Sequence, residues 1–139
     1  MNYHHHLGVY AWIERDGQVL LIRKARGPYT GLLDLPGGSL EPGELLVPAL
    51  GREVSEETGY TMADATQWQT LDVLFPHQDP TEGAKVLRHI GVIYRAEVAG
   101  VLRGTADGLD AAGAAWYPLA TLLEAQVTPM VWQLLQNKP

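Results

Sequence analysis

The order of hydrophobic and polar residues along the chain predicts strands interspersed with a few helices. Segments 7–14 and 18–24 are rich in Val, Ile, Tyr, Trp and Leu, and Arg15-Asp16-Gly17 between them is a turn signal. This arrangement predicts a β-hairpin. Further strands are predicted at 32–35, 67–75 and 86–98, and a last strand is predicted to end at Trp116-Tyr117-Pro118.

Segment 45–58 has the period of an amphipathic helix. Its apolar positions are Leu46, Ala49, Leu50 and Val54. Gly59 follows as a predicted C-cap, and Pro48 falls in the first turn, where proline is tolerated. Two further helices are predicted at 119–125 and 129–137.

The segments between these elements are predicted to be loops. Residues 26–31 contain Gly, Pro, Tyr and Thr, residues 76–85 are polar and could overhang a site, and the Gly- and Ala-rich residues 99–115 are predicted to form a flexible connection. Strands mixed with two or three helices predict an α/β or α+β fold. The pattern alone leaves the choice between the two open.

Length and composition restrict the possible functions. A chain of 139 residues predicts one domain over 1–139, large enough for a core without disulfides. The sequence contains no cysteine, which excludes thiolate metal ligands and a thiol nucleophile. A net charge of −6 argues against broad electrostatic binding of a nucleic acid polymer or an anionic membrane. No apolar segment approaches the roughly 20 residues that span a bilayer, and no signal-peptide pattern is present, so we expect a cytoplasmic protein.

Three carboxylates recur at helical spacing within segment 45–58. Glu53, Glu56 and Glu57 stand at i, i+3 and i+4 and therefore on one face. Their mutual repulsion would weaken an isolated helix, and a hard divalent cation such as Mg²⁺ would relieve it, because such ions prefer oxygen ligands. An ordinary solvated acidic face is the alternative, and for three glutamates alone it is the commoner arrangement.

The residues around this cluster resemble the Nudix box of the Nudix (MutT-type) hydrolases. That motif is Gly, five residues, Glu, seven residues, then Arg-Glu-aliphatic-x-Glu-Glu-x-Gly and a hydrophobic residue. Residues 38–60, GSLEPGELLVPALGREVSEETGY, match every fixed position, with Tyr60 in place of the usual aliphatic residue. A chance match in a chain of this length has a probability below about one in a million. The resemblance extends over nearly the whole chain and implies the Nudix fold, a mixed β-sheet between helices.

Transferred residue by residue, the resemblance implies a metal-dependent site. Glu56 and Glu57 would be metal ligands, and Glu53 would be a third ligand or the general base for the attacking water. Arg52, together with Glu44, would hold Glu53 in place through charge-assisted hydrogen bonds. The implied metal is Mg²⁺, with Mn²⁺ as an alternative.

Two further ligands are predicted outside this helix. Gly37 and Gly38 permit a tight turn with the backbone close to the metal, and the Gly37 carbonyl is a candidate ligand. Some family members take one more ligand from a later strand, and Glu97 stands at a suitable place. A solvated strand residue is the alternative for Glu97.

Arg23, Lys24 and Arg26 form a dense basic group just before the box. Alternation along a strand puts Arg23 and Lys24 on opposite faces, so at most one of them would face the site. We expect Arg23 or Arg26 to bind an outer phosphate and Tyr29 to stack on a base, with simple surface decoration as the alternative.

The histidines carry no comparable signal. His4, His5 and His6 are expected to be a frayed terminus, with binding of a transition metal as the alternative. His77 and His89 are single residues without a partner pattern.

The resulting hypothesis is a Mg²⁺-dependent hydrolase of the phosphoanhydride bond in a nucleoside diphosphate derivative. We expect a nucleoside triphosphate to be cleaved to a nucleoside monophosphate and pyrophosphate. The alternatives are an ADP-ribose or nucleotide-sugar pyrophosphatase and a non-catalytic Nudix-fold nucleotide-binding domain. The expected partner is a small nucleotide, and the sequence leaves a homodimer open.

Overall fold

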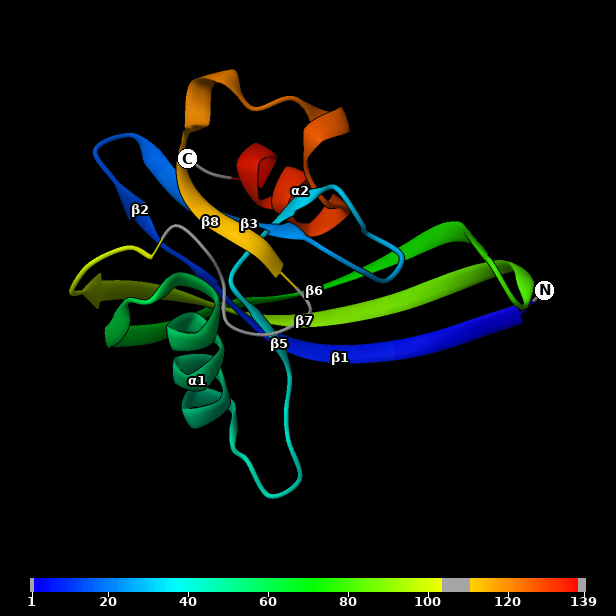
Figure 1. Cartoon of the computed structure of the whole chain (residues 1–139), viewed down its shortest axis with the longest axis horizontal. Coiled ribbons are helices and arrows are strands. Elements are labelled where there is room, and N and C mark those ends of the chain that lie inside the picture. The colour runs from blue at the N-terminus through cyan, green and yellow to red at the C-terminus, as the bar shows by residue number, and fades with distance from the viewer. Residues whose placement is uncertain (1, 104–110, 138–139) are drawn as a thin grey trace.

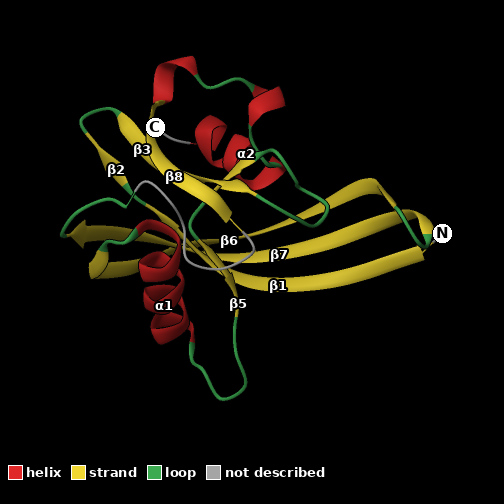
Figure 2. Ribbon diagram, in the orientation of Figure 1, coloured by secondary structure: helices red, strands yellow, loops and turns green. Residues whose placement is uncertain are grey.

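The computed structural model of the protein describes residues 2–103 and 111–137. Within these residues two β-sheets lie between two helices, with α1 on one side and α2 on the other (Figures 1 and 2). The structure therefore has the mixed α+β architecture expected from the sequence. In chain order the elements are β1 (Asn2–Trp12), β2 (Glu14–Arg15), β3 (Gln18–Lys24), β4 (Leu33–Asp34), β5 (Gly37–Ser39), α1 (Leu46–Thr58), β6 (Thr61–Asp79), β7 (Gly83–Ala99), β8 (Ala111–Pro118), η1 (Leu119–Thr121), η2 (Glu124–Gln126) and α2 (Pro129–Asn137).

The larger sheet is mixed and has the strand order β5-β1-β7-β6. β1 runs parallel to β7, whereas β5 and β6 pair with their neighbours in antiparallel fashion. The smaller sheet contains β2, β3 and β4, and β8 pairs with β3. The N-terminal half of β1 and the β6–β7 turn extend together beyond the helices (Figure 1).

The predicted first hairpin is only partly correct. Its turn is present, with positive φ at Asp16 and Gly17, and β2 pairs with β3. Residues 7–12, however, belong to β1 and pair with β7 in the other sheet. Every residue from Gly8 to Ile13 is buried, so both faces of this segment lie in the core. A continuous apolar run shows that a strand is buried but not which strand is its partner.

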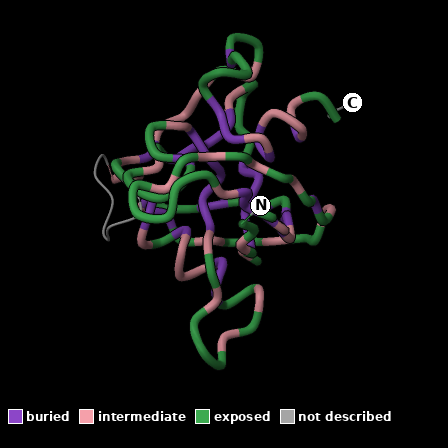
Figure 3. The backbone as a smooth tube through the Cα atoms, turned by 90° about the vertical axis from the view of Figure 1, so that its right-hand side faces the viewer, coloured by how far each residue is buried: buried purple, intermediate pink, exposed green. Residues whose placement is uncertain are grey.

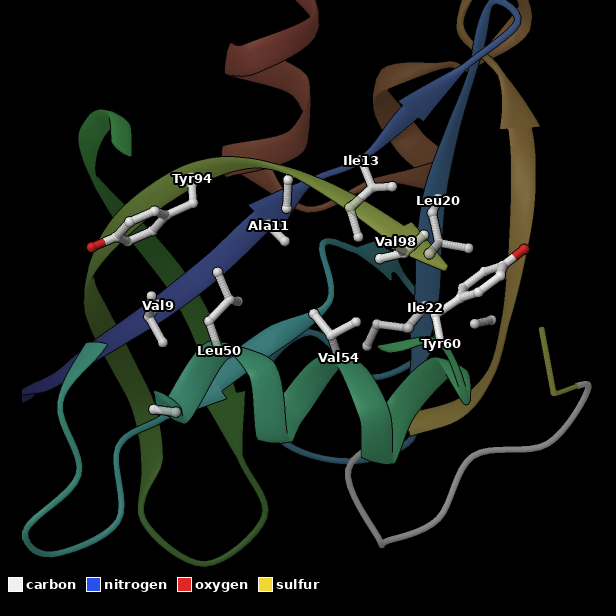
Figure 4. Close-up of a cluster of buried hydrophobic side chains, with 13 residues drawn as sticks. Val9, Ala11, Ile13, Leu20, Ile22, Leu50, Val54, Tyr60, Tyr94 and Val98 are labelled. Atoms are coloured by element: carbon white, nitrogen blue, oxygen red, sulfur yellow. The ribbon is translucent and has the colours of Figure 1, made fainter. Parts of the chain in front are cut away.

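Two hydrophobic clusters fill the space between the sheets and the helices. Alternation along β1 sends Val9 and Ala11 toward α1 and sends Tyr10 and Trp12 toward α2. Figure 4 shows the first cluster, and Figure 3 shows the buried segments gathered at the centre of the molecule. On α1 the buried apolar positions are Ala49, Leu50 and Val54, as the helical period predicted.

Two predicted connections are wrong. The polar segment 76–85 is mostly strand, because β6 continues to Asp79 and β7 begins at Gly83. Pro76 lies in β6, which is an edge strand, and edge strands are where proline occurs within sheets. The predicted helix 119–125 is replaced by the separate turns η1 and η2, since Leu122 between them is extended and buried.

The remaining predictions agree with the structure to within a few residues, with two exceptions. β6 begins six residues earlier than predicted. In the predicted flexible connection 99–115, β8 already begins at Ala111, and residues 104–110 lie outside the described part of the chain. Gly59 caps α1 with a φ of 83°, and its N–H donates to the Ser55 carbonyl. In the described residues, no helix combines the length and apolar character needed to cross a membrane.

Candidate active site

The turn before α1 presses the backbone of Gly37 against β1. Gly37 has a φ of 145°, and a Cβ added there would lie 2.1 Å from the Val9 carbonyl oxygen. Any side chain at this position would therefore collide with β1, and only glycine avoids this collision. The Gly37 N–H donates to Oε1 of Glu57 at 2.8 Å. Gly37 thus joins β1, β5 and the C-terminal half of α1 at one point.

Arg52 lies at the centre of the charged cluster on α1. Its Nε and Nη2 each donate to one carboxylate oxygen of Glu44 at 2.8 Å, which makes a bidentate pair. Its Nη1 donates to Oε1 of Glu53 at 3.0 Å and to Oε2 of Glu56 at 3.3 Å. The hydrogen bonds from Arg52 lower the pKa of Glu44 to about 2. The structure thus brings Arg52 to Glu44 and Glu53, and the guanidinium offsets part of the repulsion expected among the carboxylates.

Glu57 is the buried member of the three carboxylates. It is 4% exposed, and burial raises its pKa well above the ordinary value. The nearby charge of Glu53 raises this pKa further, whereas the Gly37 N–H and the charge of Lys24 lower it. A cation bound beside Glu57 would favour the ionised carboxylate for the same reason that Lys24 does.

The donor set of the box fits a hard divalent cation. Glu53, Glu56 and Glu57 offer carboxylate oxygens, and the side chains of Glu53 and Glu56 are 15% and 46% exposed. Among residues 2–103 and 111–137, no three acidic or imidazole groups are already arranged to enclose a metal ion. Mg²⁺ suits such an open arrangement, because it usually binds one or two carboxylates together with waters and substrate phosphates.

The structure does not bring Glu97 to the box. Tyr94, Ala96 and Val98 pack into the cluster beneath α1, so the alternate residue Glu97 points to the other face of β7. There it is exposed and lines a separate hollow with Glu14 and other polar residues. The predicted role of Glu97 as a further metal ligand is therefore corrected to that of a solvated strand residue.

A hollow of about 420 Å³ lies next to the box. Gly37 and Gly38 form the side of the hollow that it shares with the box. Gly38 also lies against Glu53, because an added Cβ would be 3.2 Å from its Oε1. The remaining walls come from β1, β3, β4, β7 and the segment after β3. The hollow and the carboxylates of α1 therefore meet at the Gly37–Gly38 backbone.

The basic residues of the hollow differ from those predicted. Lys24 and Arg26 line it, whereas Arg23 on the opposite face of β3 donates from Nη1 to the Gly31 carbonyl at 2.8 Å. Arg23 and Lys24 lie on opposite faces of β3, as predicted, and of the two only Lys24 lines the hollow. Arg26, the other residue expected to bind an outer phosphate, also lines it.

Tyr29 lines the hollow but is not an exposed stacking surface. Tyr29 is only 4% exposed. The ring of Phe75 packs edge-on against the Tyr29 ring, with 4.8 Å between the two ring centroids. Its hydroxyl is 2.9 Å from Nδ1 of His89. The expectation that Tyr29 stacks on a base is therefore corrected: Tyr29 is part of the wall, where its hydroxyl is already engaged.

His89 is the residue of the hollow that the sequence did not reveal. It is 2% exposed, and its Nε2 is 2.7 Å from the Tyr10 hydroxyl while its Nδ1 contacts Tyr29. The Tyr10 hydroxyl also contacts Nε2 of His6 at 3.2 Å. His4, His5 and His6, expected to be frayed, are strand residues of β1 that line the hollow. The partners of His89 are distant in sequence, so no local pattern could have indicated them.

We expect His89 to make stability depend on pH. Burial lowers the pKa of its imidazole to about 3, from an ordinary value of 6.5. As the pH falls below 6.5, the unfolded chain therefore binds a proton before the folded protein does, and stability is lost down to about pH 3. Between pH 7.5 and pH 5 this residue should remove about 2 kcal/mol from the free energy of unfolding.

Denaturant unfolding of the wild type and of His89→Gln at both pH values measures this effect. Glutamine retains one donor and one acceptor for Tyr10 and Tyr29, so the variant should lose less stability on acidification by that amount. His5→Gln, at an exposed position of β1, is the matched control and should behave as wild type. An equal loss in wild type and His89→Gln would contradict the assignment.

Comparison with known proteins identifies the family. The family model described as NUDIX domain matches residues 4–137, and the chain belongs to this family. A solved structure described as a MutT NUDIX hydrolase from Burkholderia pseudomallei superimposes with a TM-score of 0.77 at 28% identity. That match covers 98% of this chain and 99% of the other.

Curated relatives have several activities in their names. The nucleoside triphosphatase NudI of Salmonella agona is 44% identical over 64 residues, which are 43% of this chain and 45% of the relative. The 8-oxo-dGDP phosphatase NUDT18 of Homo sapiens is 32% identical over 113 residues, 80% of this chain and 31% of the relative. The ADP-ribose pyrophosphatase of Methanocaldococcus jannaschii is 47% identical over 47 residues, 34% of this chain and 28% of the relative. The chain thus spans less than half the length of each of these three relatives.

Proposed function

We propose that this domain is a Mg²⁺-dependent hydrolase that converts a nucleoside triphosphate to a nucleoside monophosphate and pyrophosphate. The observation that carries the proposal is the junction at Gly37 and Gly38, where a hollow of about 420 Å³ meets the carboxylates of α1. A nucleoside placed in the hollow would have its phosphates at this junction. The name of the relative NudI, a nucleoside triphosphatase, is consistent with this substrate class.

The carboxylates of α1 are the residues proposed to hold the metal. Glu56 and Glu57 would be ligands, and the Gly37 carbonyl is a further candidate. A divalent cation held there would offset the negative charge of the phosphate oxygens and polarise the reacting phosphoanhydride. Nudix hydrolases generally use divalent metal ions; Mg²⁺ is the proposed one because the ligands are oxygen atoms in an open arrangement.

Arg52 and Glu44 are proposed to position Glu53 rather than to contact the substrate. Arg52 donates to both carboxylates, so its guanidinium can hold Glu53 in one orientation. Glu53 then either accepts the proton of the attacking water or serves as a third ligand. A pH–rate profile that loses its acidic limb in Glu53→Gln would favour the role of proton acceptor.

The proposed reaction cleaves an internal phosphoanhydride. The oxygen of water forms a bond to one phosphorus, the bridging oxygen leaves with the neighbouring phosphate, and the proton of water passes to a carboxylate of the site. With the nucleoside in the hollow, the phosphates nearest to it lie at the junction, and the outer phosphate lies beyond. Lys24 and Arg26 line the hollow and could contact these phosphates. Cleavage at an internal bond therefore releases pyrophosphate.

Product analysis tests this proposal. Chromatography after incubation of a nucleoside triphosphate with Mg²⁺ should show monophosphate and pyrophosphate in equal amounts. Diphosphate plus orthophosphate would contradict cleavage at the internal bond. The same assay on ADP-ribose and a nucleotide sugar tests the alternative substrates, of which ADP-ribose appears in the name of one relative. Absence of turnover on the whole panel would favour a binding domain without catalysis.

A further inference from the structure

His4 and His77 meet on the part of the large sheet that extends beyond the helices (Figure 1). His4 belongs to β1 and His77 to β6, and β7 lies between these two strands. His4 and Phe75 both pair with Leu87 of β7, so the three side chains share one face of the sheet. His77 stands two residues after Phe75 and therefore shares that face as well.

The two imidazole rings direct one nitrogen each at a common point. Nε2 of His4 lies 2.8 Å from Nε2 of His77, and the rings meet edge-on with an interplanar angle of 68°. The ring of His77 also stacks on that of Phe75, with 6.3 Å between the centroids, which restricts its orientation. At this separation one Nε2–H donates to the other nitrogen, so a single proton occupies the point between them.

A transition-metal ion can take the place of that proton. Imidazole nitrogens bind such ions at about 2.0–2.1 Å. Two nitrogens at right angles about one ion are then about 2.9 Å apart, whereas tetrahedral coordination requires about 3.4 Å. The separation of 2.8 Å between the two Nε2 atoms matches the right-angle arrangement, which is typical of Cu²⁺ and Ni²⁺.

The surroundings of the pair favour a neutral imidazole at His4, which is the form that binds a metal. Burial lowers the pKa of His4, and the charges of Lys85 and His77 lower this pKa further. The charges of Asp79 and Glu82 act in the opposite direction and raise it. Nζ of Lys85 donates to Oε1 of Glu82 at 2.9 Å, so its positive charge is partly offset. His4 and His77 are both only partly buried, so an ion can reach them from solvent.

The histidine pair is separate from the carboxylates of α1. Gly38 of the box pairs with Val9 of β1, and His4 stands five residues before Val9. Five extended residues span roughly 16 Å, so the pair lies well away from the carboxylates and shares no ligand with them. Mg²⁺ prefers oxygen ligands, whereas imidazole suits Cu²⁺ and Ni²⁺. The two places therefore differ in the ion that they prefer.

We propose that His4 and His77 form a binding site for a first-row transition-metal ion with right-angle coordination, such as Cu²⁺ or Ni²⁺. The bound ion would join β1 to β6 directly, two strands that β7 otherwise separates. Waters would complete the coordination, since among residues 2–103 and 111–137 no three acidic or imidazole groups are arranged to hold a metal ion. The inference does not depend on the proposed hydrolysis.

Calorimetric titration of Ni²⁺ in the presence of excess Mg²⁺ tests the site, because Mg²⁺ competes for the oxygen ligands of the box. The wild type should bind Ni²⁺ at the histidine pair. His77→Gln should weaken this binding by at least about 10-fold, since even the loss of a residue that only hydrogen-bonds to a ligand costs roughly that much. His5→Gln is the matched control: His5 is exposed, alternation along β1 turns it away from His77, and the variant should bind as wild type does.

A second measurement uses the wild type alone and does not depend on how well a variant folds. The EPR spectrum of bound Cu²⁺, recorded in the same excess of Mg²⁺, should show coupling to two imidazole nitrogens. Coupling to any other number of nitrogens would overturn the assignment.

The variants separate the folded site from binding by the histidine run alone. His77 lies 73 residues from His4 in the chain, so only the folded structure brings the two together. Unchanged Ni²⁺ binding in His77→Gln would show that residues 4–6 bind the ion by themselves, and would overturn the proposal. Absence of Ni²⁺ binding by the wild type would overturn it as well. Loss of binding in His77→Gln together with wild-type binding in His5→Gln would support it, whether or not any nucleotide is hydrolysed.

Discussion

Glu57→Gln is expected to lower the rate of hydrolysis by at least about 100-fold under saturating Mg²⁺. The substitution removes the charge of a buried carboxylate that is proposed to hold the metal, while its oxygen can still accept the hydrogen bond from Gly37. The fold should persist. Because burial disfavours the ionised form of Glu57, the metal-free variant should be as stable as wild type or more stable.

Two measurements separate loss of chemistry from loss of structure. Thermal unfolding without metal should show no decrease in Tm for Glu57→Gln. Glu124→Gln, an exposed residue of η2 far from the box in sequence, is the matched control and should retain wild-type rates. Full activity in Glu57→Gln would show that the box match has no catalytic role and would favour a binding domain.

Removal of divalent cations is expected to abolish hydrolysis. The carboxylates of α1 and the phosphates of the substrate are both negative, and Lys24 and Arg26 are the basic residues of the described chain that line the hollow. Without a divalent cation these charges are not offset at the reacting bond. Turnover should vanish in EDTA and return when Mg²⁺ or Mn²⁺ is added in excess.

Direct measurement of metal binding shows whether the cation acts through the carboxylates of α1. Titration of Mn²⁺ into wild type and Glu57→Gln should show weaker binding by the variant, whereas Glu124→Gln should bind as wild type does. Undiminished turnover in thoroughly chelated buffer would exclude the metal-dependent mechanism.

The elements that the sequence predicted well are those set by local interactions. Helix α1 follows from its apolar period, from Pro48 in the first turn and from Gly59 at the cap, all of which act within a few residues. The contact of Arg52 with Glu44 and Glu53 is also local, because all three residues lie in the box. The spacing of the box therefore predicted both the family and most of the residues in the charged cluster.

The errors arose where a partner is distant in sequence. Strand 7–12 was assigned to the wrong neighbour because its apolar pattern is the same whether it pairs with β3 or with β7. Glu97 was a candidate ligand because some family members take one from a later strand, but alternation along β7 turns its side chain to the opposite face. Arg23 and Lys24 could be distinguished only once the face of β3 was known.

The sequence by itself determined the family, the helix with its carboxylates and the tight turn before it, since each depends on residues close together in the chain. Only the tertiary structure decided which other residues form the site next to the helix and the turn. The hollow is built from β1, β3, β4 and β7, and His89, Tyr10 and Asp34 meet there from separate strands. Burial and hydrogen bonding give these residues their properties, and both arise from packing between segments whose proximity no local pattern encodes.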